Sequence, residues 1–129
     1  MKRVAVSFVL SAAAAVAATG VAAAAEYPKS DFQGKFAHGH TGGTITWYNR
    51  AVGVSGFVMD EPAPGSTAVL FQFRGPNGEL YDAQTRTVSD DYRKFGWAQP
   101  GPAGGIARVD VYLVHDRERH LVESLRRKA

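Results

Sequence analysis

Apolar and polar side chains alternate with a period of two along much of the chain, and this alternation constrains the fold more than any other feature. The clearest run extends from Ile106 to His115, where Ala107, Val109, Val111 and Leu113 alternate with Arg108, Asp110 and Tyr112. Successive side chains of a β-strand point to opposite faces, so this run indicates a strand with one buried face. Similar alternation occurs in Val69–Phe73, Glu79–Val88 and Tyr92–Ala98.

Residues that favour turns separate these runs. Asp60–Ser66, Gly75–Gly78, Ser89–Asp91 and Gln99–Gly105 are rich in Pro, Gly, Ser, Asn or Asp, which suit loops and tight turns. Short strands at intervals of about 8–12 residues, without a helical pattern between them, predict an all-β fold. We expect a small antiparallel β-sandwich or barrel-like sandwich.

The apolar residues change parity between Thr44 and Asp60. They occupy odd positions at first, Ile45 and Trp47, and then even positions, Val52, Val54 and Val58. A shift of one residue turns every side chain of a strand to the other face. Asn49-Arg50, between the two sets, therefore predicts a bulge or a tight corner between two strands. Because Trp47 and Tyr48 are adjacent on a strand, we expect Trp47 to face inward and Tyr48 outward.

Two segments at the margins of the alternating region are less regular. Residues 26–43 contain Pro28 and four glycines, which predict an extended lead-in before a β domain of residues 44–129. Residues 116–129 fit either a helix capped by Asp116 or a hairpin turn followed by a last strand from Arg119 to about Arg127. We favour the strand, because the apolar stripe of the alternative helix would be thin.

The chain contains no cysteine, so packing and hydrogen bonds must stabilise the fold without a disulfide. Large apolar side chains on one face of each run are the candidates for the core. They are Phe57, Phe71, Phe73, Phe95, Trp97, Val109 and Val111.

The first 25 residues have the layout of a secretory signal peptide. A short basic segment, Met1–Arg3, precedes an apolar run, and Ala23-Ala-Ala25 offers small residues for cleavage after Ala25. The alternative is an uncleaved membrane anchor, since residues 4–25 are long enough to span a bilayer. Serine, threonine and glycine dilute this segment, so we expect cleavage, secretion to the extracellular space and no stable membrane span afterwards.

Cleavage after Ala25 would also change the charge of the protein. It would remove Lys2 and Arg3 and leave 13 basic and 12 acidic side chains, a net charge of +1. A nucleic-acid-binding protein normally carries a strongly basic patch or stripe. We therefore expect no nucleic-acid partner.

Few residues form a pattern with known chemistry. His38 and His40 would lie on one side of an extended segment, either as a pair of metal ligands or as two solvated side chains. Gly53–Phe57 resembles a nucleophile elbow, but its fifth residue is not glycine and no helix follows. The pairs Asp60-Glu61 and Asp90-Asp91 do not match a calcium-binding loop. We expect no enzymatic activity, no cofactor and no bound metal.

Tyr48 and Arg50 are the candidates for a ligand or partner surface. The segment Trp47–Arg50 combines flat apolar rings with an amide and a guanidinium, a mixture that suits carbohydrate stacking or a protein contact. The alternative is structural: Tyr48 lies on the neighbouring strand, and Arg50 pairs with a loop carboxylate.

Four motifs of the chain are Trp47–Gly56, Gln84–Arg86, Phe95–Trp97 and Gly104–Val111. Together they resemble a set of small exported proteins of actinobacteria, of the type WYNR-x-VGV-x-G. The resemblance covers most of residues 26–129 and implies export and an all-β fold that ends in a strand. It implies no activity, because none is known for the set. Members of the set often have a pair of cysteines, and this chain departs from them in having none.

Two functions are compatible with these observations. The first is a non-enzymatic exported binding or accessory module, whose partner is an extracellular protein or a cell-envelope polymer. The alternative is a small secreted inhibitor of a hydrolase, which would present Asp60–Ser66 or Gln99–Gly105 as a rigid loop.

The signal peptide can be tested directly. Amino-terminal sequencing of the protein from culture medium should give Glu26 as the first residue, or a residue close to it. A product that begins at Met1 and sediments with membranes would show that the segment is an anchor.

Overall fold

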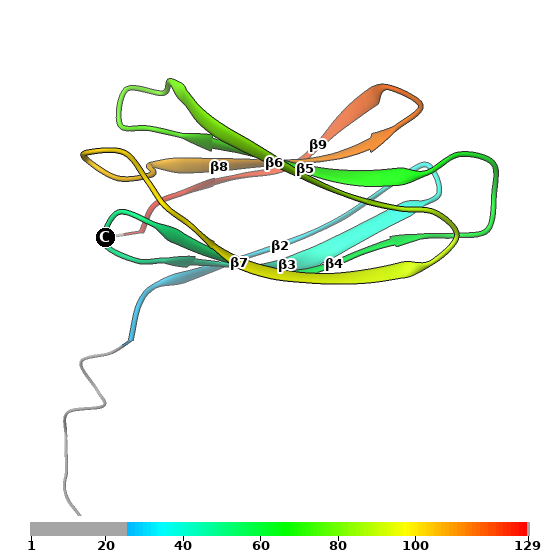
Figure 1. Cartoon of the computed structure of the whole chain (residues 1–129), viewed down its shortest axis with the longest axis horizontal. Helices are drawn as coiled ribbons and strands as arrows, with labels where there is room; N and C mark the ends of the chain where they lie inside the picture. Colours follow the sequence, from blue (N-terminus) through cyan, green and yellow to red (C-terminus); the bar gives the residue numbers. More distant parts are fainter. Residues whose placement is uncertain (1–25, 129) are drawn as a thin grey trace, which may run out of the picture.

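The computed structural model describes residues 26–128, and these residues form eight strands and no helix (Figure 1). The strands are β2 (Lys29–Phe36), β3 (Gly39–Trp47), β4 (Val52–Asp60), β5 (Thr67–Arg74), β6 (Leu80–Val88), β7 (Tyr92–Gln99), β8 (Arg108–His115) and β9 (Glu118–Arg126). The expected signal peptide, residues 1–25, lies outside the described residues.

The strands form two four-stranded antiparallel sheets that stack face to face (Figure 1). The first sheet has the order β2-β3-β4-β7, and the second sheet has the order β6-β5-β8-β9. The chain passes from the first sheet to the second after β4 and after β7, and it returns after β6. The predicted all-β antiparallel sandwich is therefore confirmed, with two open sheets rather than a barrel.

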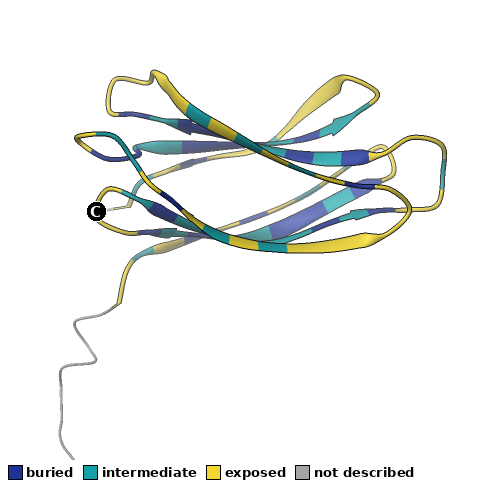
Figure 2. Cartoon of the chain, in the orientation of Figure 1, coloured by how far each residue is buried: buried dark blue, intermediate teal, exposed yellow. Residues whose placement is uncertain are grey.

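The inner faces of the two sheets bury one hydrophobic layer (Figure 2). Its members that are at most 2% exposed are Phe32, Ile45, Trp47, Val52, Val54, Val58, Val69, Phe71, Phe73, Ile106, Val109, Val111 and Leu113. Burial of each such side chain contributes on the order of 2 kcal/mol before the conformational entropy is subtracted. The predicted burial of Phe71, Phe73, Val109 and Val111 is confirmed, as are the inward position of Trp47 and the outward position of Tyr48.

Three aromatic residues that we expected to be buried in the core are not: Phe95 and Trp97 pack against its edge, and Phe57 lies outside it. Phe95 and Trp97 are only half-buried, because β7 is an edge strand and the strand that faces it across the sandwich, β6, presents polar side chains. The guanidinium of Arg86 lies 4.1 Å from the centre of the Trp97 ring. Phe57 points away from the core, because its neighbour Val58 is fully buried and adjacent side chains take opposite faces.

The predicted corner at Asn49-Arg50 is the turn of the hairpin between β3 and β4, in which Trp47 pairs with Val52. The tail is a strand, as favoured, since β9 pairs with β8 along its length. Asp116 and Arg117 form the two-residue turn before it and both have positive φ angles, 49° and 70°, as a type I′ turn requires.

Residues 26–43 do not form a separate lead-in, because β2 and most of β3 lie among them and pair in the first sheet. The glycines that suggested an irregular segment are accommodated within strands. A Cβ atom on Gly43 would lie 2.1 Å from the carbonyl oxygen of Ser55, so glycine lets β3 and β4 approach each other closely here. The β domain therefore includes Lys29 and the residues that follow it.

Asp60 connects the end of β4 to the second sheet and to the turn after β6. The residue is 3% exposed, and its carboxylate accepts hydrogen bonds from the backbone N–H of Asp90 (2.9 Å) and the hydroxyl of Thr67 (2.6 Å). These two hydrogen bonds, chiefly the one from Asp90, lower the pKa of Asp60 below its ordinary value of 3.8. The ionised carboxylate is thus favoured by the folded state.

The stability of the protein should therefore depend on pH through Asp60. A carboxyl group whose pKa is lower in the folded state stabilises that state above its unfolded pKa, and the effect is lost as the pH falls through the folded pKa. Thermal melts from about pH 5 to about pH 2 should show a steeper loss of stability for the parent than for Asp60→Asn. Glu61→Gln, at the exposed neighbour, is the control, and equal slopes for all three proteins would contradict this role.

The two tryptophans should differ in their contribution to stability. Trp47→Ala removes a fully buried ring and should cost about 3–5 kcal/mol, whereas Trp97→Ala removes a half-buried ring and should cost about 2 kcal/mol. Urea denaturation of the two variants measures both values. A larger loss for Trp97→Ala than for Trp47→Ala would contradict the assignment of the core.

Candidate ligand-binding surface

The turn between β3 and β4 presents the two residues that the sequence singled out. The Trp47 ring lies in the core, and its Nε1–H donates a hydrogen bond to the hydroxyl of Ser30 (2.9 Å). Tyr48 follows on the opposite face and is 36% exposed, and its backbone N–H donates to the carbonyl of Ala51 (3.1 Å). Arg50, at the tip of the turn, is exposed.

Arg127, from the end of the chain, fixes this turn from behind. Its guanidinium donates hydrogen bonds to the carbonyl oxygens of Ile106 (2.7 Å), Ala51 (3.4 Å) and Tyr48. It also lies 5.3 Å from the centre of the Trp47 ring. Burial lowers the pKa of Arg127, yet a guanidinium stays charged in proteins, so these are charge-assisted hydrogen bonds. No local signal in the sequence indicates such distant partners.

Two exposed tyrosines form a ridge beside the turn. The ring of Tyr48 lies across the backbone of Gly53, where a Cβ atom would be 3.0 Å from the ring. Tyr27 contacts the Tyr48 ring edge to face, with ring centres 5.0 Å apart and planes at 82°. Tyr27 is 42% exposed. Tyr27 has no distinguishing pattern in the sequence, because it lies in the segment expected to be an irregular lead-in.

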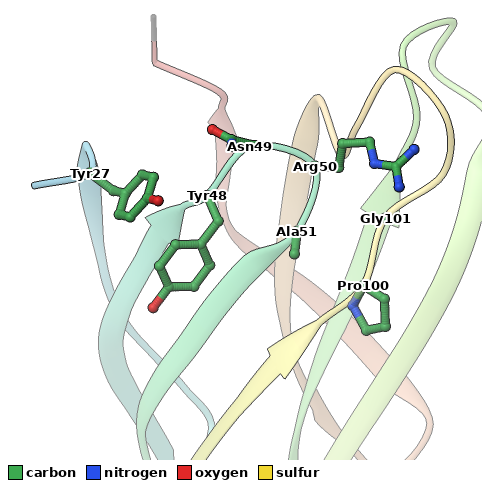
Figure 3. Close-up of a pocket in the computed structure, with 7 residues that line it drawn as sticks. All are labelled: Tyr27, Tyr48, Asn49, Arg50, Ala51, Pro100 and Gly101. Carbon is green, nitrogen blue, oxygen red and sulfur yellow. The ribbon is translucent and has the colours of Figure 1, made fainter. Parts of the chain in front are cut away.

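A shallow hollow of about 420 Å³ lies between these rings and Arg50 (Figure 3). It is lined by Tyr27, Tyr48, Asn49, Arg50, Ala51, Pro100 and Gly101. Figure 3 shows the tyrosines on one side and Arg50 with Pro100 on the other. A second hollow of about 330 Å³ lies on the far side of the ridge and is lined by Glu26, Tyr27, Lys29, Thr46 and Tyr48. The structure therefore brings Tyr48 and Arg50 together in one concave surface.

The loop between β7 and β8 packs closely against the turn and completes the first hollow. The N–H of Ile106 donates to the carbonyl of Arg50 (3.1 Å), and the N–H of Gly105 donates to Pro102 (2.8 Å). A Cβ atom on Gly101 would lie 2.0 Å from the Arg50 carbonyl oxygen, so only glycine fits there. The hollow offers aromatic surface, an amide and a guanidinium, which can stack on, hydrogen-bond to and attract a ligand.

The other candidate residues do not gather at this hollow. His38 packs against His115, with ring centres 5.7 Å apart, whereas His40 packs against Phe57, at 5.3 Å. The two histidines thus contact different parts of the molecule and not one common point. Within residues 26–128, no three His, Cys, Asp or Glu side chains lie together as a metal site would need. Ser55 is an exposed residue in the middle of β4, followed by more strand.

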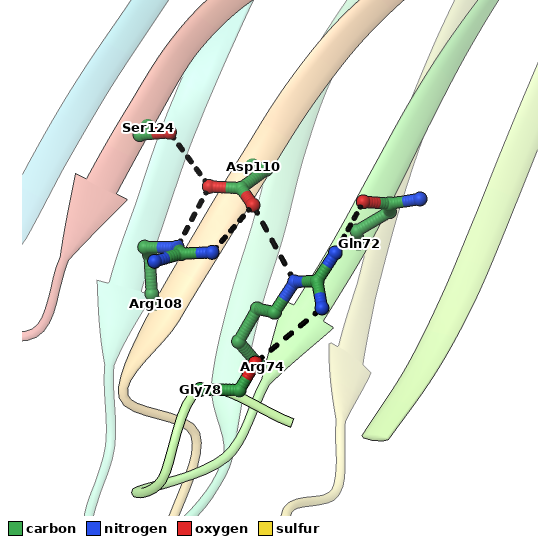
Figure 4. A network of polar contacts seen from close by, with 6 residues as sticks. All are labelled: Gln72, Arg74, Gly78, Arg108, Asp110 and Ser124. Carbon is green, nitrogen blue, oxygen red and sulfur yellow. Dashed lines mark hydrogen bonds and ion pairs between the residues drawn. The ribbon is translucent and has the colours of Figure 1, made fainter. Parts of the chain in front are cut away.

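The outer face of the second sheet carries a network of ion pairs around Asp110 (Figure 4). Asp110 is 4% exposed, and its carboxylate accepts two hydrogen bonds from Arg108 (3.0 and 3.1 Å) and one from Ser124 (2.7 Å). Arg74 lies 3.5 Å away and donates to Gln72 (3.0 Å). One carboxylate thus faces two guanidiniums, and the network, which has a net charge of +1, links β5, β8 and β9 through charge-assisted hydrogen bonds.

A comparison with models of protein families, with curated proteins and with solved structures found no match to this chain. The resemblance to small exported actinobacterial proteins therefore stays an expectation. In the part of the chain that the structure describes, no helix is long and apolar enough to cross a membrane.

Two arginines provide a test of this geometry. Arg50→Ala removes an exposed side chain and should change the free energy of unfolding by less than about 0.5 kcal/mol. Arg127→Ala leaves three backbone carbonyls without their charged donor and should cost about 2–3 kcal/mol. Urea denaturation of both variants measures the difference. Equal stabilities would show that Arg127 does not fix the turn.

Proposed function

We propose that the protein is an exported, non-enzymatic binding module that binds an extracellular ligand at the hollow between Tyr48 and Arg50. The observation that carries this proposal is the convergence of three separate segments there: the Tyr27 segment, the β3–β4 turn and the β7–β8 loop. Export follows from the signal peptide expected in the sequence.

Preorganisation supports a binding role. Arg127 and the backbone hydrogen bonds of the β7–β8 loop fix the turn before a ligand arrives. The exposed side chains Tyr48 and Arg50 therefore start from a rigid backbone, which reduces the entropy lost on binding. The side chains that line the hollow include tyrosine, asparagine and arginine, and these suit a polar polymer with flat apolar faces, such as a glycan of the cell envelope.

A hydrolase inhibitor is the second candidate, because the β7–β8 loop has the rigidity that an inhibitory loop needs. Two backbone hydrogen bonds, from Ile106 to Arg50 and from Gly105 to Pro102, restrain the part of the loop that precedes β8. Inhibitory loops bind enzymes as preformed, exposed segments with little change of shape. Such a complex would use the tip of the loop, Ala103-Gly104, rather than the tyrosine ridge.

Retention experiments can separate the two candidates. Purified protein is incubated with cell-wall material and, in parallel, with concentrated culture medium, and bound partners are identified. The binding module predicts retention on the wall material that is lost in Tyr48→Ala and Arg50→Ala, but kept in the control Thr85→Ala on the second sheet. A stoichiometric complex with a hydrolase that is lost only on changing Ala103 would favour inhibition. Retention unaffected by Tyr48→Ala and Arg50→Ala would overturn the proposed function.

A further inference from the structure

Glycine is unusually prominent on the outer face of the first sheet. Gly42 on β3, Gly53 on β4 and Gly96 on β7 all have side-chain positions that point away from the core, since their neighbours on each strand point inward. Glycine is disfavoured in strands. Where it occurs inside one, it often marks a place where a ligand or another backbone approaches closely.

Two of these glycines are explained within the molecule, and the third is not. A Cβ atom on Gly42 would lie 3.1 Å from the Phe57 ring, and one on Gly53 would lie 3.0 Å from the Tyr48 ring. Each of these two glycines therefore leaves room for an aromatic ring to pack directly against the backbone of the strand. A Cβ atom on Gly96 would meet nothing closer than a carbonyl oxygen 3.9 Å away, and Gly96 does not have a positive φ angle. The fold itself therefore does not require glycine at position 96.

The surface around Gly96 consists of small side chains. Gly96 pairs with Ser55, which pairs with Thr44, and the next row contains Ala98, Gly53 and Thr46. The charged side chains of this face lie on the edge strands only: Lys29, Asp31 and Lys35 on β2 and Lys94 on β7. The middle of the face is thus low, uncharged and rich in hydroxyl groups.

Aromatic rings lie at both ends of this low area. At one end Phe57 stacks on Tyr92, with ring centres 5.4 Å apart and planes at 18°, and Tyr92 is 50% exposed. At the other end Tyr48 covers Gly53 and contacts Tyr27. Gly53 and Phe57 are four residues apart on β4, so the two aromatic groups are separated by about 13 Å. A ligand that contacts both must be extended.

We infer that the outer face of the first sheet binds an unbranched β-1,4-linked glycan chain, which stacks on Phe57–Tyr92 and on Tyr48 and passes over Gly96. Such chains are flat ribbons with apolar C–H faces and hydroxyl groups along their edges. They match aromatic rings at both ends and the hydroxyls of Thr44, Thr46 and Ser55 between them. A protein partner would need large buried anchors at the centre of the face, where this face has none. The inference rests on the proposed function, because Tyr48 belongs to both surfaces.

Gly96 provides the test. Chitohexaose and cellohexaose are titrated by calorimetry into the parent protein and into Gly96→Gln, which places a long side chain in the path of the glycan. The matched control is Ala83→Gln, at an exposed position on the outer face of the second sheet. We expect one of the two hexasaccharides to bind the parent, Gly96→Gln to weaken that binding by at least about tenfold, and Ala83→Gln to leave it unchanged. If Gly96→Gln does not fold, Ala98→Gln blocks the same path one row further along β7.

Three outcomes would overturn the inference, and they also separate it from the proposed function. Unchanged binding by Gly96→Gln would place the glycan elsewhere. Binding of neither hexasaccharide, together with a wall partner that is lost in Tyr48→Ala, would overturn the glycan path and leave the binding module standing. Unchanged binding in Phe57→Ala would show that the second aromatic group is not used. A monosaccharide, N-acetylglucosamine, should bind much more weakly than the hexasaccharide, because it reaches only one aromatic group.

Discussion

Packing between the two inner faces of the sandwich is the interaction on which the rest of this structure depends. The chain has no cysteine, and the described residues form no helix that could cover either sheet, so the layer around Trp47 and Phe71 provides most of the apolar burial. This layer also determines the surface. Because side chains alternate along a strand, burial of Val54 and Val58 places Ser55 and Phe57 on the outer face of the first sheet.

Arg127 links the core to the candidate site. Its guanidinium contacts the core ring of Trp47 on one side, and on the other it donates to the carbonyls of the turn that presents Tyr48 and Arg50. The end of β9, in the second sheet, is thereby connected to the β3–β4 turn of the first. Because Arg127 binds the turn through backbone carbonyl oxygens, the side chains of the turn remain available to a ligand. A preorganised binding surface needs this combination of a rigid backbone and exposed side chains.

Much of this fold could be predicted from alternation, because burial of one face imposes a period of two on the sequence. Alternation predicts that Trp47 points inward and Tyr48 outward, and that a corner lies at Asn49-Arg50. It does not distinguish a central strand from an edge strand, and for this reason Phe95 and Trp97 were expected to be more buried than they are. The glycines of residues 26–43 are typical of an irregular segment, and for this reason the sequence did not predict β2 and the start of β3. The contacts of Arg127 and the alignment of Phe57 with Tyr92 depend on strand pairing between distant segments, which no local pattern contains.

The central claim is that a ligand binds at Tyr48, beside the hollow of the β3–β4 turn, and extends from there along the outer face of the first sheet. Nuclear magnetic resonance spectra of the labelled protein, recorded during titration with chitohexaose or cellohexaose, test it most directly because they report on every backbone amide at once. The account predicts shifts concentrated at Tyr48, Ser55, Phe57, Tyr92 and Gly96, with little change on β5, β8 and β9. Shifts centred on the outer face of the second sheet, around Leu70 and Tyr112, or no shifts at all with either glycan, would contradict it.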